Sequence, residues 1–129
     1  MRDNKELEMQ ANNLRIDVVN MIYSAKSGHP GGSMSCIEIL TSLYHSIMDL
    51  STDKKGQRKD KFILSKGHAA PAYYATLSSV GFIPHEDLVT LRKCNSYLEG
   101  HPSIKINGVD SSSGSLRPRP FDCKWNRDL

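Results

Sequence analysis

The chain has 129 residues, which is enough for one domain around one hydrophobic core. Hydrophobic residues make up 38% and charged residues 24%, a globular composition that excludes the disordered, collagen-like and membrane classes. The net charge of +3 comes from scattered basic residues, and the one basic run, at 54–61, reads as a solvated loop rather than a nucleic-acid interface. We expect no nucleic-acid partner, no membrane anchor and a cytoplasmic protein.

The first predicted helix begins near Leu7. Its apolar residues recur every three or four positions, which places them on one face of a helix. They are Leu7, Ala11, Leu14, Val18, Ile22 and Ala25. Lys26-Ser27-Gly28 follows, and a cation followed closely by a glycine is typical of a helix end. His29 is therefore expected just past this end.

A second helix is predicted over residues 35–48. Ser35 and Glu38 have the spacing of a capping box, and apolar residues continue at helical spacing beyond them. The polar segment 49–60 comes next. Phe62-Ile63-Leu64 is apolar and too short for a helix, so it indicates a buried strand.

Two further helices are predicted after this strand. Pro71 suits the first turn of a third helix, which Gly81 would end. A fourth helix is expected to begin near Pro84 and to end with Arg92 and Lys93, whose charges are favourable at the negative end of a helix. Helices on both sides of a buried strand indicate an α/β fold class.

Three of the five histidines directly follow a glycine, which is more than composition alone predicts. They are His29, His68 and His101, and the first and last belong to the same tripeptide, Gly-His-Pro. Each lies in a predicted loop beside a helix or strand end, where active sites collect in open α/β folds. Glycine lets the backbone approach a ligand, and imidazole can relay protons near neutral pH. The set therefore indicates a site for a polar, anionic substrate.

Each histidine taken alone would suit a structural role, and only the set favours a site. A metal site is disfavoured because these histidines lie 39 and 33 residues apart, without the close pair that usually starts a zinc site. The three cysteines lack a C-x-x-C pair, so neither zinc nor a disulfide framework is indicated. His45 and His85 do not follow a glycine and are predicted to be structural.

Residues 94–115 are rich in Gly, Ser and Asn and are predicted to form a loop. The stretch from Asp110 to Leu116 could wrap a phosphate or an aromatic ring, and its composition fits a flexible linker equally well. Beyond Leu116 the periodicity ends abruptly. We therefore expect one domain over 1–116 and a non-native or disordered tail over 117–129.

Four motifs occur together in the order and spacing of one family. They are Ser27-Gly28-His29-Pro30-Gly31-Gly32-Ser33, Asp60-Lys61-Phe62-Ile63-Leu64-Ser65-Lys66-Gly67-His68-Ala69, Gly100-His101-Pro102 and Gly114-Ser115-Leu116. Over residues 5–116 the chain resembles the transketolases. Its short N-terminus and its Gly-Ser-Leu motif resemble the N-terminal subunit of split transketolases.

The resemblance implies a partial thiamine-diphosphate-binding fold, with helices packed on a parallel sheet that is incomplete at the C-terminus. It implies transfer of a two-carbon ketol unit between sugar phosphates, with the carbanion chemistry carried by thiamine diphosphate. The site residues that it implies are His68 at the diphosphate, Gly114, Ser115 and Leu116 at the cofactor, and His29 and His101 at the substrate as hydrogen-bonding and proton-transfer groups. It also implies Mg²⁺, pairing with a C-terminal transketolase subunit, and a homo- or hetero-oligomer. The related deoxyxylulose-phosphate synthases resemble the chain less at residues 28–32.

Transketolases continue after Gly-Ser-Leu with Gly-Gln-Gly and, later, with an Asp and an Asn that hold the metal. Neither Gly-Gln-Gly nor the Gly-Asp-Gly motif that carries this Asp follows Leu116 here, so no metal ligand is assigned. We expect weak cofactor binding and no activity from the chain alone, because the metal neutralises the diphosphate charge. An alternative from a different class is a non-catalytic interaction module that pairs with a transketolase partner chain.

The tail suggests a hypothesis for this departure from the family pattern. One choice of codons for Arg117 to Trp125, read with the first base dropped, encodes Gly-Gln-Gly-Leu-Ser-Ile-Ala-Asn-Gly. A single-base insertion after Leu116 would therefore explain the tail. The nucleotide sequence tests this hypothesis, since codons that do not permit the alternative frame would reject it.

Overall fold

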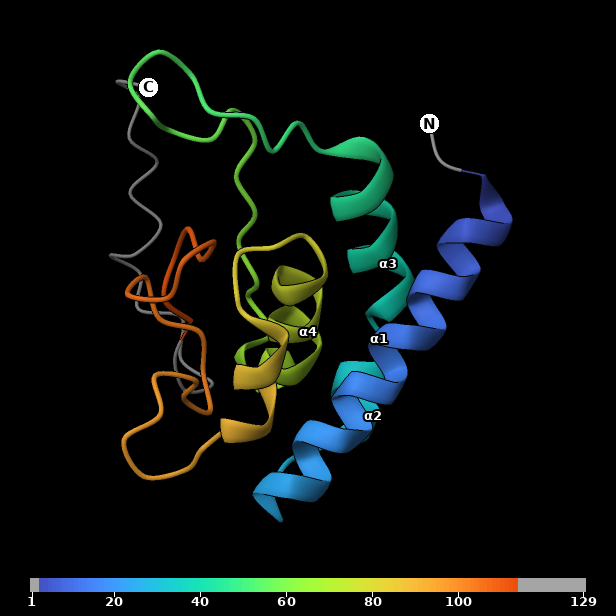
Figure 1. Cartoon of the computed structure of the whole chain (residues 1–129), viewed down its shortest axis with the longest axis vertical. Coiled ribbons are helices and arrows are strands. Elements are labelled where there is room, and N and C mark those ends of the chain that lie inside the picture. The colour runs from blue at the N-terminus through green and yellow to red at the C-terminus, as the bar shows by residue number, and fades with distance from the viewer. Residues whose placement is uncertain (1–2, 114–129) are drawn as a thin grey trace.

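The computed structural model describes residues 3–113 of the chain (Figure 1). Gly114, Ser115 and Leu116, expected at the cofactor, lie outside the described residues, as does the predicted tail at 117–129. None of the helices in the described part is long and apolar enough to cross a membrane.

Helix α1 (Asn4–Ala25) confirms the first predicted helix. Its buried residues are Ala11, Leu14, Val18 and Met21. The helix ends at Lys26, which has a left-handed φ of 49° and whose N–H donates to the carbonyl of Tyr23. Lys26 thus takes the left-handed conformation that a glycine usually supplies at a helix end.

The helix predicted over 35–48 is confirmed over 37–47, where an α-helix continues directly into a π-helix, and a short helix that was not predicted precedes it. The continuous pair is α3 (Ile37–Ser42) and the π-helix η1 (Leu43–Ile47), and the short helix before it is α2 (Pro30–Met34). Pro30 lies in the first turn of α2, so helical structure begins before Ser35. The capping box does not form, since Ser35 Oγ donates to the carbonyl of Gly32 and Glu38 pairs with Arg15 of α1.

The third predicted helix is confirmed, and the fourth is not an α-helix. After the 3-10 turn η2 (Gly67–Ala69), helix α4 (Ala70–Ser79) begins as predicted with Pro71 in its first turn. The 3-10 helix η3 (His85–Thr90) replaces the fourth predicted helix. Arg92 follows with a φ of 57°, and a left-handed residue does not continue a right-handed helix.

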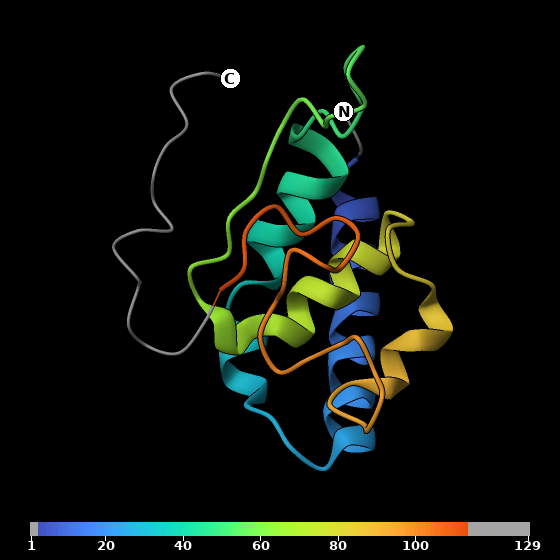
Figure 2. The same ribbon diagram turned by 90° about the vertical axis from the view of Figure 1, so that its left-hand side faces the viewer.

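Helix α4 forms the centre of the described structure. Every residue from Ala70 to Leu77 is buried, as expected for a helix that is surrounded on all sides. Helix α1 contacts α2, α3, α4 and η3. Figures 1 and 2 show the segment 94–113 covering the side of α4 that faces away from α1. The core therefore lies around α4, between α1 and this segment.

No strand forms within residues 3–113, so the predicted strand Phe62–Leu64 is not present there. A strand requires a neighbour that exchanges backbone hydrogen bonds with it. The N–H of Phe62 instead donates to the carboxylate of Asp110 over 2.9 Å. Leu64 is buried whereas Ile63 is 66% exposed, so the segment packs on one side only.

Candidate active site

The three glycine-preceded histidines lie together. The ring centroid of His68 is 6.1 Å from that of His29 and 5.0 Å from that of His101. His29 immediately precedes α2, His68 lies in η2, and His101 lies in the segment 94–113. The structure thus brings together three loops that are far apart in the sequence.

Local backbone geometry sets the position of His29. This residue is the N-cap of α2, but its side chain makes no capping hydrogen bond, so the imidazole is not used to hold the helix. Gly28 precedes it with a φ of 142°, and a Cβ at Gly28 would lie 3.2 Å from Cγ1 of Ile22 in α1. The backbone conformation and the close approach of α1 both favour glycine at this turn.

His101 carries a buried Nε2 atom that has no hydrogen-bond partner among the described residues. Desolvation lowers the pKa of His101, and the neighbouring His68 and Arg92 act in the same direction. A lowered pKa favours the neutral imidazole near pH 7, which can accept a proton. A buried polar atom without a partner is costly, so a ligand atom that met Nε2 would be stabilised there.

Two cations lie beside these loops, and sequence reasoning gave neither of them a role in a site. Nζ of Lys66, two residues before His68, donates to Ser35 Oγ over 2.7 Å. Nη1 of Arg92 donates to Ser27 Oγ over 2.7 Å, just before the first Gly-His-Pro. Lys66 is part of the sequence motif that contains His68, so the motif could have indicated it. Arg92 was predicted only as a helix-end cation.

The stretch from Asp110 to Leu116, for which a ligand-wrapping loop and a flexible linker were equally expected, is described only as far as Ser113. Asp110 accepts a backbone hydrogen bond and pairs with Arg58, so its carboxylate has protein partners. The N–H of Ser113 donates to the carbonyl of Pro102 over 3.0 Å, and the Ser113 hydroxyl is buried with no partner among the described residues. The described part of this loop therefore lies beside the second Gly-His-Pro.

The other two histidines make contacts that fit the structural role predicted for them. His45 Nε2 lies 2.8 Å from Ser79 Oγ, and His85 Nε2 lies 2.9 Å from Asp17 Oδ1. In the part of the chain that the structure describes, no group of three or more His, Cys, Asp or Glu could hold a metal ion.

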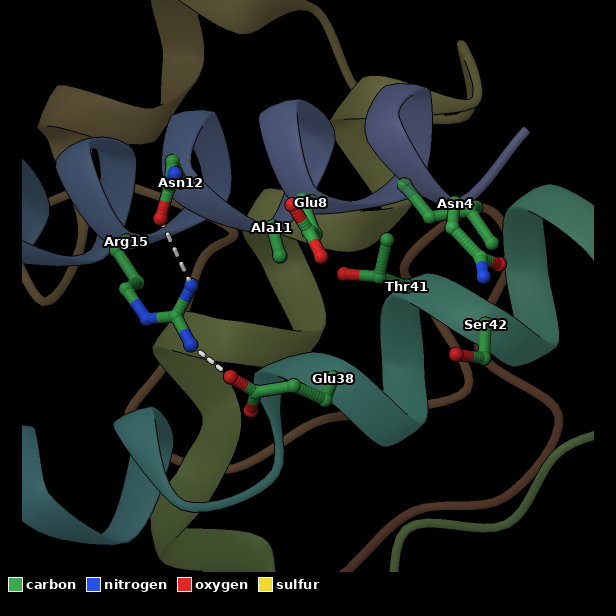
Figure 3. A pocket seen from close by; sticks show the side chains of 9 residues that line it. Asn4, Glu8, Ala11, Asn12, Arg15, Glu38, Thr41 and Ser42 are labelled. Atoms are coloured by element: carbon green, nitrogen blue, oxygen red, sulfur yellow. Dashed lines mark hydrogen bonds and ion pairs between the residues drawn. The ribbon is translucent and has the colours of Figure 1, made fainter. Parts of the chain in front are cut away.

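A separate groove of about 470 Å³ lies between α1 and α3 (Figure 3). Arg15 crosses it, donating to Asn12 and pairing with Glu38. None of the three site histidines lines this groove. Because these charged groups already have protein partners, we do not include the groove in the candidate site.

The chain is similar in sequence and in structure to proteins of one family. The profile of the family described as "Transketolase, thiamine diphosphate binding domain" matches residues 7–117. One of the subunits of the apulose-4-phosphate transketolase of Phocaeicola vulgatus is 43% identical over 111 residues, covering 85% of this chain and 40% of the relative. Human transketolase is 41% identical over 111 residues, covering 85% of this chain and 18% of the relative. The solved transketolase from Leishmania mexicana matches with a TM-score of 0.76 at 30% identity, over 85% of this chain and 17% of that chain.

The fold and these matches define a thiamine-diphosphate-binding domain. The chain belongs to the transketolase family, as the motifs in the sequence indicated. The predicted fold is confirmed as that of the N-terminal transketolase domain. The predicted parallel sheet is not found among residues 3–113. The chain spans two fifths or less of the length of these relatives.

Proposed function

We propose that the protein takes part in a transketolase reaction, in which a two-carbon ketol unit passes between sugar phosphates with thiamine diphosphate as cofactor. The observation that carries this proposal is the contact of His68 with both His29 and His101 in a chain of this family. The names of the relatives support the reaction class. A cytoplasmic location is part of the same proposal.

In this proposal His68 contacts the diphosphate, while His29 and His101 hydrogen-bond the sugar phosphate and move protons. The unpartnered Nε2 of His101 suits a ligand atom, and the lowered pKa of His101 suits a proton acceptor. Lys66 adds a positive charge close to His68, which favours an anionic group. Thiamine diphosphate, when bound, supplies the carbanion chemistry.

Gly114, Ser115 and Leu116 are proposed to complete the cofactor site of a domain that spans 1–116. Magnesium is proposed for the whole protein from family membership alone. The described residues contain no cluster of metal-ligating side chains. We therefore assign no metal ligand in this chain and no step that uses a metal.

We also propose that Phe62–Leu64 forms a strand of a parallel sheet in the whole protein. The exposed side chain of Ile63 supports this, since a buried strand would have both faces covered. The neighbouring strands would come from the parts of the relatives that the chain does not match.

The proposed partner is a C-terminal transketolase subunit, within a homo- or hetero-oligomer. The outer face of α1 supports a contact, because large apolar side chains recur there at helical spacing. They are Met9, Ile16, Val19 and Tyr23, between 52% and 84% exposed. Hydrogen exchange of α1, measured with and without a C-terminal transketolase subunit, tests this contact. Protection of α1 is expected, and unchanged exchange would reject it.

Titration of the isotope-labelled chain with thiamine diphosphate, followed by NMR of the histidine rings, tests the function. The His68 resonances should shift first, and pyrophosphate alone should shift them too, because the diphosphate is the group that His68 contacts. Thiamine without its diphosphate is the control and should leave His68 unchanged. NMR also detects weak binding, so a His68 ring that does not respond to thiamine diphosphate, with or without Mg²⁺, would contradict the proposal.

A further inference from the structure

Arg92 has an uncommon backbone conformation just after η3. Its φ of 57° lies in the left-handed region, which residues with a side chain seldom occupy. The N–H of Arg92 donates to the carbonyl of Leu98 over 2.9 Å, and the hydroxyls of Thr90 and Ser96 lie 2.8 Å apart in the same turn. Such a conformation persists only where the surrounding contacts determine it, and it is often found at functional sites.

The Arg92 side chain joins the two loops that carry Gly-His-Pro. Its Nη1 donates to the hydroxyl of Ser27, which precedes Gly28-His29. The rest of the guanidinium lies against Gly100, which precedes His101. A Cβ at Gly100 would lie 2.9 Å from Nε and 3.2 Å from Cζ of Arg92. A side chain at position 100 would therefore displace this guanidinium.

We propose that Arg92 is a positioning residue of the candidate site. Its guanidinium fixes the loops of His29 and His101 relative to each other, and so sets the contacts that both rings make with His68. The site itself rests on the proposed function, whereas the contacts of Arg92 do not. Arginine suits this position because a planar guanidinium can stack on the backbone while it donates a hydrogen bond from its edge, which a lysine ammonium cannot do.

The charge of Arg92 acts on His101 as well. After desolvation and the neighbouring His68, it is the third cause of the lowered pKa of His101. Removal of the arginine charge should therefore raise the His101 pKa toward its ordinary value. Lysine at position 92 would retain the charge without the planar contacts, so the two contributions can be separated.

NMR of the full 129-residue chain tests the proposal through ring-to-ring NOEs among the three histidines and through the titration of His101. Arg92→Gln should weaken the NOEs of His68 to His29 and His101 and raise the His101 pKa. Arg92→Lys should weaken the NOEs but keep the pKa low. Gly100→Ala retains every charge, displaces the guanidinium and should weaken the same NOEs. Lys93→Gln, which removes an exposed charge one residue away, is the matched control and should change neither measurement.

A folded Arg92→Gln variant with unchanged NOEs and an unchanged His101 pKa would overturn the proposal. If that variant does not fold, Ser27→Ala decides instead, because it removes only the hydrogen-bond acceptor. A His29–His68 NOE as strong as in the parent chain would then overturn it. A chain that does not respond to thiamine diphosphate, but whose Arg92 variants behave as expected, would reject the proposed function and support the role of Arg92.

Discussion

Arg58 and Asp110 form an ion pair at 2.5 Å, although their side chains are only 11% and 12% exposed. The Arg58 guanidinium also donates to the carbonyl of Gly108 over 2.9 Å and lies 4.9 Å from the ring centroid of Phe82. Asp110 accepts a second hydrogen bond from the N–H of Phe62. The pair therefore joins three segments that are distant in the sequence.

Replacement of Arg58 by Met should lower the free energy of unfolding by about 3–5 kcal/mol, because the Asp110 carboxylate would remain buried without its cation. Urea unfolding measures this loss. Lys59 is the control, since it is 55% exposed in its own ion pair and its replacement by Met should leave the midpoint nearly unchanged. The double variant Arg58→Met, Asp110→Leu should recover much of the loss, and simple addition of the two single losses would contradict a coupled pair.

Alanine variants at Gly108 and Gly81 would distinguish backbone strain from steric crowding. Both have a positive φ, 91° and 86°, but a Cβ at Gly108 would lie 2.8 Å from Leu77 Cδ2, whereas nothing lies within 4 Å of one at Gly81. Gly81→Ala should cost about 1–2 kcal/mol from strain alone. Gly108→Ala should cost a further 1–3 kcal/mol, roughly, from overpacking. Thermal unfolding compares the two variants, and equal losses would show that crowding at Gly108 is relieved without cost.

Protonation of His101 should destabilise the folded chain as the pH falls. Its pKa is lowered in the folded chain, while the unfolded chain titrates near the ordinary value of 6.5. Between these two pKa values the unfolded chain binds more protons than the folded chain. The contribution of His101 to the free energy of unfolding is therefore complete above pH 6.5 and is lost as the pH falls through the folded pKa. The urea midpoint should therefore fall less in His101→Gln than in the parent chain between about pH 7 and about pH 5. The same change of urea midpoint with pH in both proteins would show that His101 has the same pKa in the folded and unfolded chain.

Helices with a strong local signal could be predicted from the sequence. The apolar stripe of α1 and the Pro71 at the start of α4 act within one or two turns of chain, so neighbouring residues contain the signal. The absence of the capping box at Ser35 could not be predicted in this way. Glu38, which would have completed the capping box, finds its partner Arg15 on another helix.

The site could be predicted only in part, for a related reason. Glycine before His29, His68 and His101 is visible in the sequence, and their shared context indicated a common site. The contact of Arg92 with Ser27 spans 65 positions, and nothing in a single sequence shows which distant side chains meet. A strand at Phe62–Leu64 likewise depends on neighbours that local sequence does not specify.

The central position of α4, closed off by α1 and the segment 94–113, bears on how such a protein folds during synthesis. Chains begin to fold as their early segments leave the ribosome. In a longer relative with the proposed parallel sheet, the part equivalent to residues 3–113 would form its helical core while the later strands of that sheet are still being made. The exposed face at Ile63 would then be where a strand synthesised later attaches, so the helices would serve as the template on which the sheet is assembled.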